Sequence, residues 1–379
     1  KEVAVDPEMI GKVYESLVNV SEEIDERGEA GIFYTERTEI DIMCRLSLVD
    51  YMANHLGEEH RNSLYEVVFA LDPDEKTEAD QHLTEANLWP QVASLLRDVT
   101  VIDPACGSGS FLVGMLNVLD DLTERADCYV GNRRSGFERK KQIIGQNLYG
   151  VDVMEWACHV AELRLWLSLI VDAEFTLEEL LCLQEPLLPH FSFKIRCGDS
   201  LVQEIGGINL GRSRSTSVIS PEVKARIADF KVQKLKFYNN DSSCSLSSVE
   251  LIRSEEQDLF LGILNDREQV FSERADMLRR MIETPQARQM RIDGTVEPES
   301  RQMSLKILEW QQELEACKRG LVGIRRTLQA LNSQQEEVPF VWDMAFVEVF
   351  EGDKNGFDIV IGNPPYVRQE SISDPRLSR

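Results

Sequence analysis

"VTVIDPACGSGSFLVGMLNVLDDL" (residues 99–122) decides the fold, because it contains a strand, a glycine-rich turn and a helix in immediate succession. The predicted strand ends at Asp103, and apolar residues follow helical spacing from about Ser110 onward. Between them, Gly107 and Gly109 allow the backbone to approach a ligand closely. The helix would present free N–H groups and its positive dipole end at the turn. The stretch therefore predicts a ligand-binding strand–turn–helix unit.

The strand–helix scheme recurs along the chain. "NLYGVDVMEWACHVAELRLWLSL" (147–169) predicts a strand that ends at Asp152 and a helix after it. "FSFKIRCGDSL" (191–201) predicts a third strand, and "GFDIVIGNPPY" (356–366) predicts a fourth. Strands that alternate with helices indicate a parallel sheet. We expect an α/β fold with a doubly wound, mainly parallel, Rossmann-like sheet, formed by residues 99–210 and 340–379.

Residues 1–98 read as a mostly helical N-terminal region. One helix is expected to start near Pro7, and a second, amphipathic helix from Glu36 to about Leu56. A glycine-containing loop, "RGEAGIFYTE" (27–36), separates them.

Residues 211–339 form an insertion far longer than an ordinary crossover between strands. A looser apolar stripe runs from Val249 to Ile282, and residues 284–300 would turn the chain. The second half has apolar residues at alternating spacings of four and three. These positions are Met303, Ile307, Trp310, Leu314, Cys317, Leu321, Ile324, Leu328 and Leu331. We expect an antiparallel, coiled-coil-like helical hairpin. An ordinary helix pair packed on the core is the alternative.

The composition, 42% hydrophobic and 28% charged residues, indicates a soluble globular protein. The most apolar stretch, residues 160–171, is too short to span a membrane and contains Glu162 and Arg164. The cysteines have no zinc-type spacing, so we expect reduced thiols, a cytoplasmic protein and no metal site. A net charge of −25 argues against a surface that binds nucleic acid throughout. Local basic stretches such as "RRSGFERKK" (133–141) are equally well explained as solvated loops.

Acidic residues also lie at the ends of the second and third predicted strands. Asp152 is placed to accept hydrogen bonds from both hydroxyls of a ribose, and Asp199 from an adenine amino group. A helix N-cap is the alternative for either aspartate. No GxxxxGK[ST] motif for binding phosphates occurs. The pattern fits S-adenosylmethionine, which is a nucleoside with a small charged tail and no phosphates.

Asn363-Pro364-Pro365-Tyr366 follows the fourth predicted strand. The amino nitrogen of adenine is a poor nucleophile, because its lone pair is delocalised into the ring. Asn363 Oδ1 and the Pro364 carbonyl can accept its two protons and direct the lone pair at a methyl group, while the prolines hold the acceptors fixed. The Tyr366 ring can stack on a base that has swung out of a duplex. A simple strand-ending turn is the alternative.

The order "GIFYTE" (31–36), "DPACGSGSFL" (103–112), "GVDV" (150–153), "CGDS" (197–200) and "IGNPPY" (361–366) resembles the γ-class N6-adenine DNA methyltransferases, in particular the large bacterial restriction–modification enzymes of the Eco57I type. The resemblance implies a loop that closes over the methionine end of S-adenosylmethionine. The cofactor-binding residues that it implies are Phe33, Tyr34, Thr35, Asp103, Ala105, Gly107, Gly109, Phe111, Asp152, Val153, Asp199 and Ser200. The catalytic residues that it implies are Asn363, Pro364, Pro365 and Tyr366.

Three departures from that family pattern change what we expect. Glu36 stands where the family usually has proline, and a basic loop is inserted between Asp103 and Asp152. The later strands and the recognition domain that would bind double-stranded DNA are missing from these residues. We therefore expect a sheet that is incomplete at its C-terminal side, and a chain that binds cofactor but is inactive alone. The helical insertion is a candidate surface for a protein partner.

Two other functions fit parts of the pattern. Protein-glutamine methyltransferases have a similar NPPY motif, since a glutamine amide also presents a planar NH₂ group. The upstream "GIFYTE" and the long helical insertion argue against this function. A non-catalytic cofactor-binding or interaction module of a defence complex is the second alternative, and the intact NPPY motif argues against it.

Overall fold

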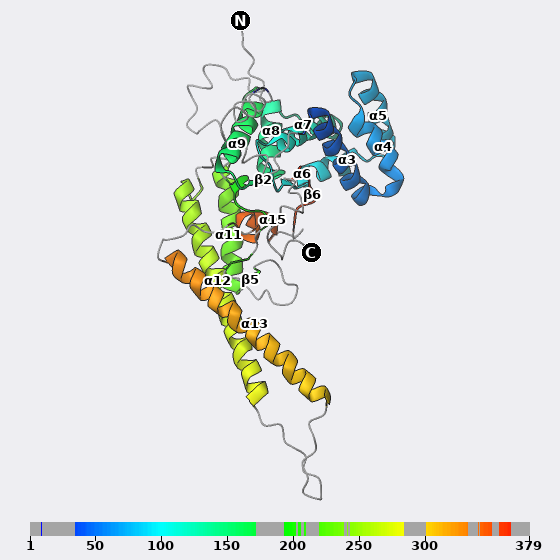
Figure 1. Cartoon of the computed structure of the whole chain (residues 1–379). Helices are drawn as coiled ribbons and strands as arrows, with labels where there is room; N and C mark the ends of the chain where they lie inside the picture. Colours follow the sequence, from blue (N-terminus) through cyan, green and yellow to red (C-terminus); the bar gives the residue numbers. More distant parts are fainter. Residues whose placement is uncertain are drawn as a thin grey trace, which may run out of the picture. The chain divides into compact units, whose positions relative to one another are not determined.

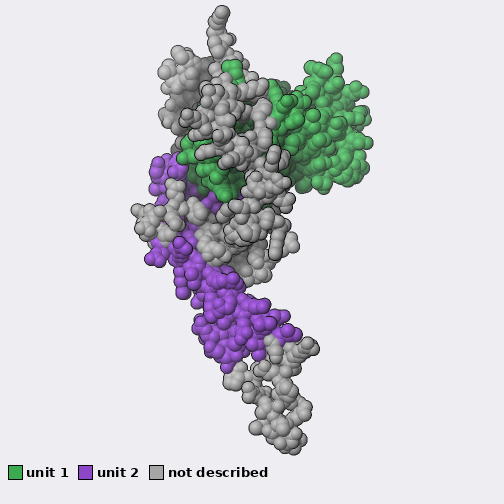
Figure 2. Space-filling model, in the orientation of Figure 1, with its two compact units in different colours: residues 1–200, 235–245, 352–379 green, residues 201–234, 246–351 purple. Residues whose placement is uncertain are grey.

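The computed structural model describes residues 9, 35–171, 193–201, 204–205, 208–209, 220–238, 241, 243–283, 301–332, 340, 342–350 and 356–364. The chain divides into two compact units, which Figure 2 colours green and purple. Unit 1 contains residues 1–200, 235–245 and 352–379, and unit 2 contains residues 201–234 and 246–351. The helix predicted near Pro7 lies outside the described residues. So do four predicted site residues: Phe33, Tyr34, Pro365 and Tyr366.

Unit 1 contains a four-stranded sheet in the order β3-β2-β1-β6, and every neighbouring pair is parallel. Its strands are β1 (Val101–Asp103), β2 (Leu148–Asp152), β3 (Ile195–Cys197) and β6 (Ile359–Val360). All four strands predicted from the sequence are confirmed, including the strand ends at Asp103 and Asp152. The mixed α/β class with a parallel sheet is therefore confirmed, whereas the Rossmann-like, doubly wound arrangement stays a prediction.

A side-chain clasp fastens β6 to β1. Asp358 Oδ2 accepts hydrogen bonds from the Thr100 amide at 2.8 Å and from the Thr100 hydroxyl at 3.0 Å. The Asp358 amide in turn donates to the Thr100 carbonyl at 3.0 Å. Two residues that are far apart in the sequence thus fix where the strand before the NPPY motif starts.

The helices of unit 1 are α3 (Arg37–Leu56), α4 (Arg61–Phe69), α5 (Pro73–Glu85), α6 (Trp89–Asp98), α7 (Ser110–Val130), α8 (Gly136–Gln146) and α9 (Glu155–Ile170), with a short 3-10 turn at Glu58–His60 (Figure 1). The amphipathic helix predicted from Glu36 to about Leu56 is α3. Local sequence signals set several ends: Pro73 opens α5, and Gly131 ends α7 with a left-handed φ of 77°.

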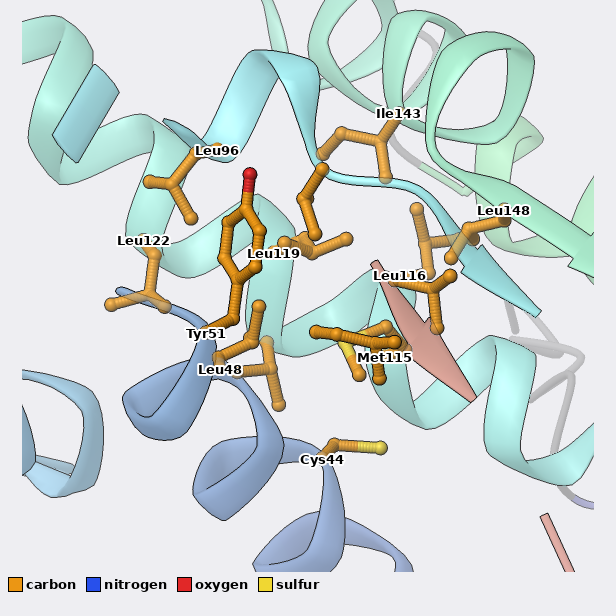
Figure 3. Close-up of a cluster of buried hydrophobic side chains, with 14 of the residues drawn as sticks. Cys44, Leu48, Tyr51, Leu96, Met115, Leu116, Leu119, Leu122, Ile143 and Leu148 are labelled. Carbon is orange, nitrogen blue, oxygen red and sulfur yellow. The ribbon is translucent and has the colours of Figure 1, made fainter. Parts of the chain in front are cut away.

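One apolar core joins α3, α6, α7, α8 and the sheet. Figure 3 shows Leu48 and Tyr51 of α3, Leu96 of α6, and Leu116 and Leu119 of α7 within this cluster. Leu116 and Leu119 have no exposed surface. This core holds the N-terminal end of α7, and with it the glycine-rich turn, in one position.

The basic stretch 133–141 is not simply a solvated loop. Residues from position 136 onward belong to α8, and Arg139 pairs with Asp120 of α7 at 2.9 Å. Arg134 pairs with Asp127 of α7 at 2.7 Å. The prediction of an inserted basic loop is therefore wrong for residues 136–141, because these residues are helical. Acidic residues of α7 neutralise Arg134 and Arg139.

Unit 2 contains a short antiparallel strand pair, β4 (Glu204–Ile205) with β5 (Ile208–Asn209). Its helices are α11 (Pro221–Tyr238), which runs on into unit 1, α12 (Val249–Glu283), α13 (Arg301–Asn332), α14 (Trp342–Ala345) and α15 (Val347–Phe350). The sequence predicted neither the strand pair nor α11. No helix among those described is long and apolar enough to cross a membrane.

The helices α12 and α13 form the predicted antiparallel hairpin. Arg274 pairs with Glu313 at 2.8 Å, whereas Glu268, earlier on α12, pairs with Arg325, later on α13, at 2.6 Å. Residue numbers that decrease along α12 are thus paired with residue numbers that increase along α13, which defines antiparallel packing. Figure 1 also shows this arrangement. The middle of the predicted heptad stripe packs against the partner helix. The residues packed there are Phe271, Ala275 and Leu278 of α12 and Trp310, Leu314, Cys317 and Leu321 of α13.

Candidate active site

The carboxyl edge of the sheet gathers the predicted site. In the parallel register Asp103 lies opposite Gly150, and Asp152 lies opposite Cys197. Because all four strands point the same way, the segments that follow them emerge at one edge. These segments include the glycine-rich turn, residues 198–200 and residues 361–364. The structure thus brings together parts of the chain that are separated by up to about 260 residues.

The glycine-rich turn has left-handed backbone at both predicted positions. The φ angle is 51° at Gly107 and 79° at Gly109. A Cβ at Gly109 would lie 2.9 Å from Cβ of Ala161 in α9, so glycine is needed there for packing as well. A Cβ at Gly107 would meet no atom of the described residues within 4 Å. The turn is therefore tightly packed at Gly109 and open at Gly107.

Asp152 braces this turn. Its Oδ2 accepts a hydrogen bond from the Gly107 amide at 2.8 Å, and its Oδ1 accepts one from the Met154 amide at 2.9 Å. The N-cap position of α9 is Met154, so Asp152 is not the N-cap of that helix. Each carboxylate oxygen retains a lone pair for a further donor.

Asp103 is nearly fully buried, with 1% of its surface exposed. Its Oδ1 accepts a hydrogen bond from the Ala105 amide at 3.1 Å. Burial raises the pKa of Asp103 to about 7, the Ala105 hydrogen bond opposes this rise, and the charge of Asp152 adds to it. A Cβ at Gly362 would overlap the Asp103 carboxylate. The segment that follows β6 therefore packs directly against Asp103.

The first half of the NPPY motif lies beside Thr35, the residue that follows "GIFY" (31–34) in the sequence. The Ile361 amide donates to the Ile102 carbonyl at 2.9 Å, which extends the pairing with β1 just beyond β6. Asn363 is half-buried, and its Nδ2 donates a hydrogen bond to Thr35 Oγ1 at 3.0 Å. Pro364 is exposed.

The remaining predicted residues differ in their surroundings. Ala105 and Ser200 are half-buried, Asp199 is exposed, and Val153 is 67% exposed. Phe111 is only 4% exposed and belongs to the apolar core. The Gly198 amide donates to the Asp152 carbonyl at 2.8 Å, which holds the segment that contains Asp199 against the end of β2. The binding roles of these residues stay predictions.

Arg164 supports the turn, a role that we did not predict from the sequence. It lies in α9, is 4% exposed, and its Nη1 donates to the Ser108 carbonyl at 2.9 Å. The same nitrogen donates to the hydroxyls of Ser108 and Ser110 at 3.0 and 2.9 Å. A lone arginine in an apolar helix, "VAELRLWLSLIV", was the available signal, because a buried charge requires nearby acceptors.

Comparison with known families gives this geometry a context. Residues 146–378 match the Eco57I restriction-modification methylase family, which is more than half of the chain. The chain belongs to this Eco57I family. Residues 78–205 also match the DNA-methyltransferase domain of MmeI. The resemblance to restriction–modification methyltransferases of the Eco57I type, which we inferred from the sequence motifs, is therefore confirmed.

A curated relative of this Eco57I-family chain is the putative type II restriction enzyme and methyltransferase RM.MjaORFECS2P of Methanocaldococcus jannaschii. The two are 31% identical over 208 residues, which cover 53% of this chain and 17% of the relative. The chain thus spans about a sixth of the length of the relative that it matches.

Proposed function

We propose that the protein that contains this chain transfers a methyl group from S-adenosylmethionine to the N6 amino group of adenine in DNA, as part of a restriction–modification or phage-defence system. The observation that carries the proposal is the convergence of Asp103, Asp152 and Asn363-Pro364 at one edge of a parallel sheet. Family membership supports the methyltransferase class. The choice of adenine is inferred from the motif and its chemistry.

The turn has features that suit S-adenosylmethionine. Among the described residues, no atom would lie within 4 Å of a Cβ at Gly107, so a ligand would have room against the backbone there. Asp152 has lone pairs left for ribose hydroxyls, and the exposed Asp199 can accept from the adenine amino group of the cofactor. The bound cofactor would supply an electrophilic methyl group on a positively charged sulfur.

The residues after β6 would prepare the target amine. Asn363 Oδ1 and the Pro364 carbonyl accept its two protons, which favours a pyramidal nitrogen with its lone pair free to attack. The nitrogen–carbon bond forms as the sulfur–carbon bond breaks, and the surplus proton leaves to solvent. Because the target base is stacked inside a duplex, it must swing out to reach these acceptors.

The partner of this site would be double-stranded DNA, held through a recognition domain outside these residues. The hairpin of α12 and α13 would offer a surface for a protein partner. We further propose a cytoplasmic location and no activity of these 379 residues alone. The domain boundaries at residues 98, 210 and 339 belong to the same proposal.

The test is transfer of tritiated methyl groups from S-adenosylmethionine to duplex DNA by the full-length protein, followed by digestion to nucleosides. N6-methyladenosine should carry the label. Asn363→Ala should lower turnover by about 10²–10³ or more, because the lost contacts act in the transition state. Cofactor affinity should stay near that of the parent.

Three results would contradict the proposal. Label on cytosine would overturn the substrate class. Label on protein glutamine rather than DNA would favour the protein-glutamine methyltransferase. Cofactor binding with no methyl acceptor in the presence of its DNA site would favour a non-catalytic module.

A further inference from the structure

The contact between Thr35 and Asn363 joins two residues that are 328 positions apart, and the sequence did not predict it. The family resemblance gives Thr35 a role at the cofactor only. We propose that Thr35 is a positioning residue for Asn363: its hydroxyl oxygen holds the amide NH₂, so that Oδ1 faces the amino group to be methylated. This inference rests on the proposed function.

The backbone at Asn363 is already fixed by its neighbours. Ile361 is 5% exposed and hydrogen-bonded to β1, while Gly362 packs against the Asp103 carboxylate. Pro364 restricts Asn363 to extended backbone conformations. The backbone does not decide the orientation of the Asn363 amide, above all the half-turn that exchanges its oxygen and nitrogen.

That half-turn decides whether the site can work. An asparagine amide has nearly the same shape in both orientations but opposite polarity, since one end accepts hydrogen bonds and the other donates them. In the wrong orientation, Nδ2 would face the target amine, and two donors would oppose each other. The amine would lose one of the acceptors that make it nucleophilic.

Thr35 supplies the partner that selects the working orientation. Its Oγ1 lies 3.0 Å from Nδ2, within normal hydrogen-bond distance. Thr35 directly precedes the N-cap residue of α3, and α3 packs through Leu48 and Met52 into the apolar core. The hydroxyl therefore sits on a rigid support. One hydrogen bond of this kind shifts the ratio of the two orientations by up to about tenfold, which raises the fraction in the working orientation from about one half to about nine tenths of an otherwise even choice.

The test compares Thr35→Val, which removes the hydroxyl at similar size, with Thr35→Ser, which keeps it. In the full-length protein, Thr35→Val should lower kcat by about twofold, while the cofactor Kd and the KM for DNA equal those of the parent within experimental error. Thr35→Ser should equal the parent in all three values within experimental error. Cofactor binding in the same preparations reports whether each variant has folded.

A second variant isolates the orientation effect. In an Asn363→Asp background, the two carboxylate oxygens are equivalent, so no half-turn has to be selected. Thr35→Val should then lower the residual kcat by much less than in the parent, which a double-mutant cycle measures as a coupling between the two residues.

The outcomes separate this inference from the proposed function. A parent protein that does not methylate adenine overturns both. An active parent with an unaffected Thr35→Val variant overturns only the positioning role. A Thr35→Val variant that loses cofactor affinity as strongly as kcat, or an equal loss in the Asn363→Asp background, assigns Thr35 to the cofactor instead.

Discussion

The helices α7 of unit 1 and α13 of unit 2 are both long, but they are buried in different ways. Most of the first half of α7 is inaccessible, and consecutive residues such as Phe111, Leu112 and Val113 are all buried. On α13, burial follows a single stripe, and Leu305, Leu308 and Val322 are exposed. A helix that is apolar all round lies inside a core, whereas a heptad stripe needs only one partner helix.

The difference matters because of what each helix carries. The N-terminal end of α7 is the glycine-rich turn, so packing around α7 fixes part of the candidate site. The paired helices α12 and α13 hold none of the predicted site residues. We therefore expect unit 1 to respond strongly to small changes near the site, and the hairpin to respond weakly and locally.

The largest expected effect comes from a matched pair of truncations. Leu116→Ala in α7 should destabilise unit 1 by about 2–5 kcal/mol, because a fully enclosed leucine leaves a cavity. Leu321→Ala in α13 should cost about 1–2 kcal/mol, because this leucine is only partly buried. Hydrogen–deuterium exchange over peptides from each helix would measure both effects. Equal losses of stability at the two positions would contradict the difference between the enclosed core around α7 and the single apolar stripe between α12 and α13.

The second effect is a loss of ligand binding. Asp152→Ala should weaken binding of S-adenosylmethionine by about 1–3 kcal/mol, because the variant loses both the brace on the Gly107 amide and the acceptors proposed for ribose. Isothermal titration calorimetry measures it. Glu85→Ala, an exposed acid at the end of α5, serves as control and should change nothing. Unchanged affinity in the Asp152 variant would remove Asp152 from the site.

The third effect concerns pH. The pKa of Asp103 is raised to about 7 in the folded protein, whereas an aspartate in the unfolded chain has a pKa of about 4. Between these two pH values the folded protein therefore keeps a proton that the unfolded chain has released. The contribution of Asp103 to the stability of unit 1 should therefore be greatest below a pH of about 4. This contribution should be lost as the pH rises toward about 7.

Asp103→Asn provides the control for this pH effect, since it keeps an oxygen for the Ala105 amide but does not titrate. Denaturant unfolding of both proteins at several pH values should show the parent losing stability relative to the variant across this window. A parent and a variant that change in parallel would show that Asp103 ionises normally.

The smallest expected effect lies on the hairpin. Arg274→Ala removes the pairing with Glu313, but both side chains are more than 40% exposed. The cost should be below about 1 kcal/mol and should shrink further at high salt, because water and ions screen such pairs. Peptide-level exchange over α12 and α13 at two salt concentrations would show it. A loss comparable to that from Leu321→Ala would mean that charge, rather than the apolar seam, holds the helices together.

Local patterns predicted much of this fold from the sequence. The strand ends at Asp103 and Asp152 follow from short runs that change from strand to glycine to helix. The heptad of α13 and the amphipathic spacing of α3 are equally local. The short β4 and β5, with two residues each, leave too little pattern to recognise, and the acids that neutralise Arg134 and Arg139 lie on a neighbouring helix.

The contacts that complete the candidate site are long-range, which is why the sequence did not reveal them. Nothing near Gly362 indicates that it packs against Asp103, and nothing near Thr35 indicates that it binds Asn363. Arg164 could be recognised as a charge within an apolar helix, but the sequence did not show which residues accept its hydrogen bonds. Motifs identified the residues, while their mutual positions required the three-dimensional fold.

The clasp between Thr100 and Asp358 has a consequence for how this site tolerates change over evolutionary time. It closes a loop of more than 250 residues, including the whole of unit 2, and the entropy lost on closing a loop grows only with the logarithm of its length. Doubling such a loop adds only about 0.6 kcal/mol. Insertions and deletions in the hairpin should therefore be nearly neutral for the strand that carries Asn363. New partner-binding segments can accumulate there without disturbing the chemistry.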